Sequence, residues 1–188
     1  MRFVFDWDKA LASILYISGK LREKRQGHKP DYYKVLKIIY FAEVEHLKKY
    51  GVPIIGDFYV AMKHGPVPSK AYDMIKAAKG DSPFSDPKGL STYFTVHGIN
   101  ITPLKEPDMD QFSTSNLECL DKAIEENRGL SFDELHKKSD TNAYKKARRD
   151  DEIAISEIVE DWGADPTMIE CLKDHAENQT FLAGFNKN

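Results

Sequence analysis

Two stretches in the first part of the chain carry apolar residues at helical spacing. The first begins at Asp8, a plausible N-terminal cap, and its apolar residues recur every three or four positions until about Gly27. The second begins at Asp31, and residues 35–42 leave it almost no polar face. Because a helix that is apolar all round belongs in a core, we expect a core helix over residues 31–50.

The period of the pattern then changes from helix to strand. Residues 57–63 are rich in aromatic and β-branched side chains, which predicts a strand with Phe58, Val60 and Met62 on one side. Residues 64–68 contain two prolines, which lack the backbone donor that a β-ladder requires. We therefore expect the strand to end before this segment.

A third helix and a hairpin are predicted next. Ser69 stands at the cap position of a helical pattern that ends at Gly80. Residues 93–96 and 99–104 have the alternation of strands and flank His97-Gly98, a pair suited to a tight turn. This arrangement indicates a β-hairpin.

The last part of the chain is again helical in pattern. Ser115-x-x-Glu118 and Ser131-x-x-Glu134 both have the spacing of a capping box. Apolar residues from 153 to 162 predict a helix stopped by Gly163, and Asp165-Pro166 has the cap and first-turn proline of a final helix.

Taken together, the patterns predict a mainly α fold of the α+β class. Residues 1–188 show no internal repeat, no low-complexity tract and no linker long enough to separate domains. We expect one helical domain with a small antiparallel β-sheet or hairpin inserted.

Composition narrows the class of protein. The chain is 41% hydrophobic and 30% charged, a globular balance. Its longest apolar run, residues 35–42, is interrupted by Lys37 and is far shorter than the ~20 residues that span a bilayer. The N-terminus becomes acidic at Asp6, too early for a signal peptide. With only two cysteines, Cys119 and Cys171, we expect a cytoplasmic protein with reduced thiols and no membrane contact.

The net charge of −3 is unevenly distributed. Residues 1–80 carry 15 Lys and Arg against 8 Asp and Glu, a charge of +7, and residues 81–188 carry the remaining 12 against 22, a charge of −10. This polarity either steers an encounter with another macromolecule or is neutralised where the two halves pack together.

Metal and cofactor chemistry finds little support. Glu43 and His46 lie three residues apart on the predicted core helix, so that both could face one ion. No second His or Cys stands four residues from either, and a solvated stripe with Lys48 and Lys49 is the favoured interpretation. We expect no metal and no cofactor.

Catalytic motifs are also incomplete. The chain has no G-x-S-x-G elbow, no cysteine beside a histidine and no Gly-rich phosphate loop. His64 precedes Gly65-Pro66 in a predicted turn, where a hydrogen bond that fixes the turn is favoured over contact with a ligand. We expect no enzyme; a hydrolase that uses His64 or His46 is the distant alternative.

Two short basic runs keep nucleic-acid binding open as an alternative. One contains Arg22, Lys24, Arg25, His28 and Lys29, and the other spans residues 145–149. Such runs can contact phosphates. Because the overall charge is negative and no recognition motif is present, we expect at most weak, non-specific binding.

One succession of motifs points to a known family. Residues 34–73 combine a Tyr40-Phe41 helix, the turn Tyr50-Gly51-Val52-Pro53, a strand that runs into His64-Gly65-Pro66-Val67-Pro68, and a helix with Tyr72. This succession resembles the Panacea domain family, also called the SocA-like antitoxin or phage-associated GepA-type domain. Residues 113–188 fit the family less closely, and Ser139-Asp140 stands where relatives carry Ser-His or Thr-His.

The resemblance implies an antitoxin of a bacterial or phage toxin–antitoxin pair, with helices around a small hairpin. Family members neutralise toxins by direct protein–protein binding, so the implied partner is a cognate toxin. Exposed residues beside the strand and turn are then the expected partner-binding set: Tyr59, Lys63, His64 and Tyr72. A nucleic-acid-binding regulator, for example an autorepressor of its own operon, remains the alternative function.

Overall fold

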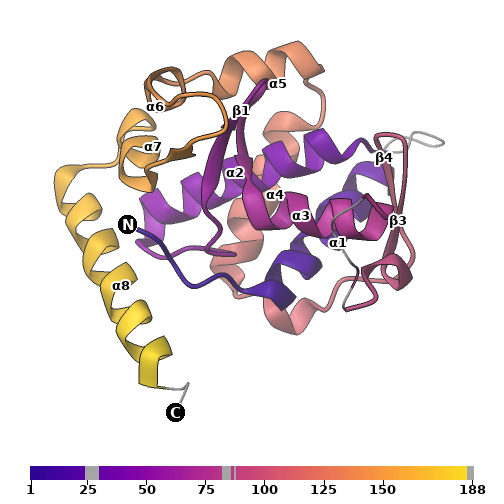
Figure 1. Ribbon diagram of the computed structural model, residues 1–188, viewed down its shortest axis with the longest axis horizontal. Coiled ribbons are helices and arrows are strands. Elements are labelled where there is room, and N and C mark those ends of the chain that lie inside the picture. Colours follow the sequence, from indigo (N-terminus) through magenta and orange to yellow (C-terminus); the bar gives the residue numbers. More distant parts are fainter. Residues whose placement is uncertain (24–29, 82–85, 87, 186–188) are drawn as a thin grey trace.

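The computed structural model describes residues 1–23, 30–81, 86 and 88–185 (Figure 1). The first half contains α1 (Trp7–Glu23), α2 (Tyr32–Tyr50), β1 (Tyr59–Met62), β2 (Gly65–Pro68), α3 (Ser69–Lys79), the short helix η1 (Leu90–Thr92), β3 (Phe94–His97) and β4 (Asn100–Pro103). The second half contains η2 (Met109–Gln111), α4 (Thr114–Asn127), α5 (Phe132–Ser139), α6 (Asn142–Lys146), β5 (Glu152–Ile153), α7 (Ile155–Asp161) and α8 (Pro166–Phe185). The predicted mainly helical fold with small antiparallel sheets is confirmed.

Helix α2 lies at the centre of the molecule and contacts α1, α3, α4, α5, α7 and β2 (Figure 1). Asp31 caps its first turn, accepting a hydrogen bond from the amide of Lys34, and Gly51 ends it in the left-handed conformation. Both boundaries were predicted from the sequence. Almost every side chain between Val35 and Leu47 is buried, as expected for a core helix.

The three-stranded sheet corrects one prediction. Strand β1 lies between β2 and β5, and β2 pairs with it in antiparallel register, so residues 65–68 do form a strand. The prolines are tolerated because β2 is an edge strand. The carbonyl of Pro66 accepts a hydrogen bond from a side chain of α2, so the backbone groups of Pro66 point away from β1. Because alternate residues of an antiparallel strand point the same way, Pro68 also points away from β1. Neither proline therefore has to donate a hydrogen bond to the neighbouring strand.

Strand β1 also presents the opposite face to the core from the one expected. Tyr59 and Ala61 are buried, whereas Val60 and Met62 are half-buried. Tyr59 packs against the ring of Tyr40 with centroids 5.3 Å apart. Its other neighbour, Ile153, belongs to β5 and not to the helix predicted from residue 153. Strand β1 is the central strand of its sheet and carries apolar side chains on both faces. The apolar pattern alone therefore did not show which face was the inner one.

The predicted hairpin is confirmed, with a shift of one residue in its turn. Strands β3 and β4 pair from Phe94 with Pro103 to His97 with Asn100, and Gly98 has a φ of 63° in the turn. The hairpin also touches the start of α2, because the amide of Tyr32 donates to the carbonyl of Ile99.

Three predicted helix starts are wrong in their capping residue. Asp6, not Asp8, accepts from the amide of Lys9 at the start of α1. The box at the start of α4 is formed by Ser113 and Asn116, two residues before the predicted one. The predicted Ser131–Glu134 box at α5 and the Asp165 cap of α8 are confirmed; the predicted end of the first helix at Gly27 lies outside the described residues.

The third wrong cap is at α3, where Ser69 makes no capping bond. The carboxylate of Asp57 instead accepts from the amides of Lys70 and Ala71 at 3.1 and 2.9 Å, besides its neighbour Phe58. Burial raises the pKa of Asp57 to about 6. A cap supplied from twelve or more residues away leaves no local sequence pattern.

Glu43 of α2 is the second buried carboxylate, with 1% of its surface exposed. Its two oxygens accept from the backbone amides of Ile54, Ile55 and Gly56 at 2.9–3.0 Å, which holds the loop between α2 and β1. Burial raises its pKa to about 7, although the three amides favour the charged form. The sequence interpretation as part of a solvated stripe is therefore wrong for this residue.

No helix within the described ranges is both long and apolar enough to cross a membrane. Both cysteines are free: Cys119 is buried in α4 and Cys171 is exposed on α8.

We expect Glu43→Ala to lower the free energy of unfolding by about 3–6 kcal/mol, because three buried amides lose their acceptor. Glu43→Gln keeps one acceptor oxygen and should lose less. Glu45→Ala is the matched control on the same helix, since its pair with Lys122 is exposed and worth about 1 kcal/mol at most. Urea denaturation monitored by circular dichroism measures all three. Equal losses for Glu43→Ala and Glu45→Ala would contradict the assignment.

Candidate functional site

The turn between β1 and β2 lies over the buried ammonium group of Lys37. Lys37 comes from α2 and is 1% exposed. Its Nζ donates to the carbonyl of Pro66 at 3.0 Å and to the hydroxyl of Ser139 at 2.8 Å. It also lies 5.5 Å from the ring centroid of Tyr33. Because no described carboxylate pairs with it, burial lowers the pKa of Lys37 to about 7.

Gly65 makes room for this ammonium group. It has a φ of 104°, and a Cβ atom at this position would overlap Lys37 Nζ and lie 2.7 Å from Ser139 Oγ. The glycine of the His64–Pro68 motif is therefore required both by its backbone conformation and by the lysine beneath it.

Ser139 completes the connection to α5. It is fully buried and donates its hydroxyl to the carbonyl of His136 at 3.0 Å. The next residue, Asp140, pairs with Lys145 at 3.3 Å. A lysine of lowered pKa beside a serine hydroxyl also occurs in Ser–Lys hydrolases. Here both groups lie beneath β2, so their contact joins α2, β2 and α5 without presenting a nucleophile at the surface.

Five aromatic side chains connected by ring contacts form what we call the aromatic patch: Tyr33, His64, Phe132, His136 and Tyr144. Phe132 stacks on Tyr33 with centroids 4.3 Å apart and meets His64 at 4.9 Å. His136 lies 5.8 Å from His64 and 6.4 Å from Tyr144. Phe132 is 44% exposed, and the other four rings are half-buried.

Two tyrosine hydroxyls fasten the patch to the turn through main-chain atoms. Tyr33 donates to the carbonyl of His64, and Tyr144 donates to the carbonyl of Met62 at 2.8 Å. The residue expected to fix the turn, His64, therefore does so through its backbone. Among the described residues, its imidazole makes ring contacts with Tyr33, Phe132 and His136 and no hydrogen bond.

The electrostatic environment of His64 is positive. Partial burial lowers its pKa, and the neighbouring basic groups of Lys63, His136, Lys37 and Arg149 lower it further, in that order. Lys63 and Arg149 are exposed at the edge of the patch. An anion that approached His64 would therefore be attracted by the positive charges of Lys63 and Arg149.

The expected partner-binding residues divide between three environments. Lys63 and His64 lie at the patch, as described. Tyr59 is 1% exposed, so its assignment to an exposed surface is wrong, and the cause is the inverted face of β1. Tyr72 lies on α3, half-buried against Tyr32 at 6.1 Å, and is not in contact with the patch rings. Sequence reasoning missed Tyr33, which lies on α2, and also Phe132, His136 and Tyr144, which come from later helices.

His46 has both ring nitrogens occupied by protein partners. Nδ1 donates to the carbonyl of Val52 at 2.7 Å, so Nε2 is the acceptor and receives bonds from Ser115 and Asn116 at 3.0 Å. Burial lowers the pKa of His46. Together with the three amides on Glu43, this geometry makes the pair a link between α2, a loop and α4. Across the described ranges no three His, Cys, Asp or Glu residues are grouped as metal ligands.

The two basic runs are placed differently. Lys24, Arg25, His28 and Lys29 of the first lie outside the described residues. In the second, Lys145, Lys146, Arg148 and Arg149 are exposed and follow directly after Tyr144 of the patch.

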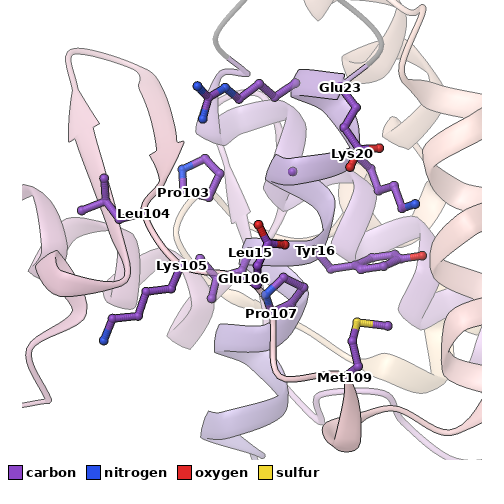
Figure 2. A pocket seen from close by; sticks show the side chains of 12 residues that line it. Leu15, Tyr16, Lys20, Glu23, Pro103, Leu104, Lys105, Glu106, Pro107 and Met109 are labelled. Atoms are coloured by element: carbon purple, nitrogen blue, oxygen red, sulfur yellow. The ribbon is translucent and has the colours of Figure 1, made fainter.

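A separate open groove lies between α1 and the segment after β4, with a volume of about 930 Å³ (Figure 2). Tyr16 and Lys20 line it from α1, and Leu104, Lys105 and Met109 line it from the other side. Its charges are mixed, and it shares no residue with the aromatic patch.

Comparison with known proteins identifies one family. The sequence model of the antitoxin SocA-like family, the Panacea domain, matches residues 35–145. This range includes α2 almost entirely, the turn with Gly65, and the patch residues His64, Phe132, His136 and Tyr144. No curated protein and no solved structure matches the chain.

We expect Gly65→Ala to destabilise the protein by about 2–5 kcal/mol, because a Cβ atom both strains the backbone and displaces Lys37. Gly98→Ala is the matched control: its φ is also positive, but nothing lies within 4 Å of the added atom. It should cost about 1 kcal/mol from backbone strain alone. Thermal and urea denaturation would measure the difference. Similar losses at the two positions would show that the lysine beneath Gly65 does not matter.

The buried Lys37 predicts a dependence of stability on pH. Between pH 7 and 10.5 the unfolded chain keeps the proton on Lys37 while the folded chain releases it, so the free energy of unfolding rises with pH there. One pKa unit corresponds to about 1.4 kcal/mol, so the rise from pH 7 to 10 is ~4 kcal/mol at most. Lys37→Met should flatten this rise, whereas Lys48→Met on the same helix should keep it. Urea denaturation at several pH values decides, and an unchanged slope in Lys37→Met would refute the effect.

Proposed function

The chain belongs to the SocA-like antitoxin family with its Panacea domain, and on this basis we propose that it neutralises a cognate toxin by direct protein–protein binding in the cytoplasm of a bacterium. The toxin would be encoded beside it, in a bacterial or phage toxin–antitoxin pair. The observation that carries the proposal is the family match over residues 35–145, which contains the turn and most of the aromatic patch.

A binding role, and not catalysis, agrees with the chemistry of the buried polar groups. Lys37 and Ser139 are in contact but sealed beneath β2, and both nitrogens of His46 have protein partners. We propose that these residues are structural and that the protein is neither an enzyme nor dependent on a cofactor.

The aromatic patch is the surface that we assign to the toxin. Aromatic residues are enriched in protein interfaces, where a few of them supply most of the binding free energy. Phe132 is exposed beside Tyr33 and His64, and the turn that carries His64 is already held by hydrogen bonds from two tyrosine hydroxyls. A partner can therefore bury these rings without ordering a loop, which lowers the entropic cost of association.

A nucleic-acid-binding regulator is the second candidate. Exposed cations at residues 145–149 next to the aromatic rings resemble the combination of positive charge and stacking surface found in single-strand binders. Such binding should be weak and salt-sensitive here. Tight, sequence-selective binding to the operator in a gel-shift experiment would favour this candidate.

The proposal predicts that co-expression protects cells from the product of the adjacent gene and that the two proteins purify as a complex. Phe132→Ala and His64→Ala should weaken the complex by about thirtyfold, the ~2 kcal/mol typical of a hot spot, without lowering the melting temperature. His64→Ala leaves the carbonyl that Tyr33 binds in place. Calorimetric titration and circular dichroism measure the two quantities.

Two further variants separate surface from core effects. Lys105→Ala, in the groove of Figure 2, should bind and protect like the wild type. Ile39→Ala, which opens a cavity beside α2, should lose protection because it costs about 2–5 kcal/mol in stability. If the neighbouring gene product is harmless and does not bind, the antitoxin proposal fails. If it binds the patch variants as tightly as the wild type, the contact lies elsewhere.

A further inference from the structure

The two ends of the aromatic patch differ in charge. At one end, Phe132 stacks on Tyr33 at 4.3 Å and offers an exposed apolar face. Burial raises the pKa of Tyr33 above its usual value, and Asp31 and Asp133 are the nearby carboxylates that raise it further. This end is apolar with an acidic border.

The other end, around His64 and His136, is cationic. Lys63 and Arg149 are exposed there, and the positive charge of each lowers the pKa of His64. Of the nearby carboxylates, Asp140 pairs with Lys145, and Asp150 approaches Arg149 at 3.7 Å on an exposed edge. Lys63 has no ion pair with any described residue.

An unused hydrogen-bonding group lies at the same end. Nδ1 of His136 is buried and has no partner among the described residues. The imidazole of His64, 5.8 Å away, likewise has no hydrogen bond to any residue that the structure describes. A buried polar nitrogen without a partner is costly, so His136 adds an unmet hydrogen-bonding requirement beneath this end of the patch.

We propose that the aromatic patch binds an acidic segment of the partner protein, with a carboxylate at the His64–His136 end and an apolar side chain against Phe132. The inference rests on the proposed function and specifies its partner: a peptide segment that combines Asp or Glu with a leucine or an aromatic residue. Complementary charge speeds association and selects the partner, while the apolar contact supplies affinity.

The acidic border at Tyr33 argues against nucleic acid as the occupant. A nucleic-acid strand carries a phosphate at every nucleotide, so a strand stacked along the rings would bring phosphates close to Asp31 and Asp133. A peptide can place a carboxylate at one end of the patch and an uncharged residue at the other.

The test is selection of a phage-displayed library of random peptides, about twelve residues long, against the immobilised full-length chain. We expect the enriched peptides to contain Asp or Glu together with an apolar residue. The affinity of the best one, measured by fluorescence anisotropy, should fall at least tenfold when its carboxylates are replaced by amides. It should fall as much for the double variant Lys63→Glu, Arg149→Glu.

The matched control is the double variant Lys105→Glu, Lys173→Glu, which makes the same change of charge at exposed positions outside the patch. It should bind like the wild type, and circular dichroism should show that both double variants remain folded. Equal loss in the two variants would reduce the effect to net charge and overturn the proposal.

Other outcomes also overturn it: no enrichment, enrichment of neutral or basic peptides, or tighter binding of a single-stranded oligothymidylate of about fifteen nucleotides. Because the selection uses no toxin, the two proposals can fail separately. Acidic peptides that bind the patch, combined with failed protection from the adjacent gene product, would refute the antitoxin role alone. Protection with neutral enriched peptides would refute only the acidic partner.

Discussion

The structure depends on the need of three polar side chains in the core helix α2 for partners inside the protein. Lys37, Glu43 and His46 are each 1% exposed, and a buried polar group without a hydrogen bond costs several kcal/mol. Each reaches a different part of the chain: Lys37 reaches β2 and α5, Glu43 the loop before β1, and His46 the start of α4. The helix that forms the core thereby also fixes the loops around it.

The need of Lys37 for partners explains why the turn between β1 and β2 lies against α5. Lys37 requires an acceptor in β2, which Pro66 supplies because an edge strand leaves its outward carbonyls free. It requires space, which only Gly65 provides, and a second acceptor, which is the hydroxyl of Ser139. Once Ser139 is held, α5 must lie across the turn, and this places Phe132 over His64.

Local signals predicted the fold class, the bounds of α2, the hairpin and two of the caps, because periodicity and capping act over a few residues. They failed where the interacting residues are far apart in the sequence. Asp57 caps α3 from twelve or more residues upstream. Ile153, which was predicted to begin a helix, instead pairs with Tyr59 in the sheet. For the site, the sequence indicated His64 and Lys63. Phe132 and His136 of the aromatic patch come from α5, whose placement depends on the bond between Lys37 and Ser139, and no spacing in the sequence reveals that bond.

The atoms that hold the turn in place differ from the side chains that it exposes, and this difference bears on how one scaffold can serve different partners. The turn is held by main-chain carbonyls of Met62, His64 and Pro66, which accept from Tyr144, Tyr33 and Lys37. These bonds do not depend on the side chains of Phe132 or Lys63, or on the imidazole of His64. Such outward groups can change without loosening the turn, because the bonds that position them involve other atoms. A protein built in this way can keep its core motif while its contact chemistry varies.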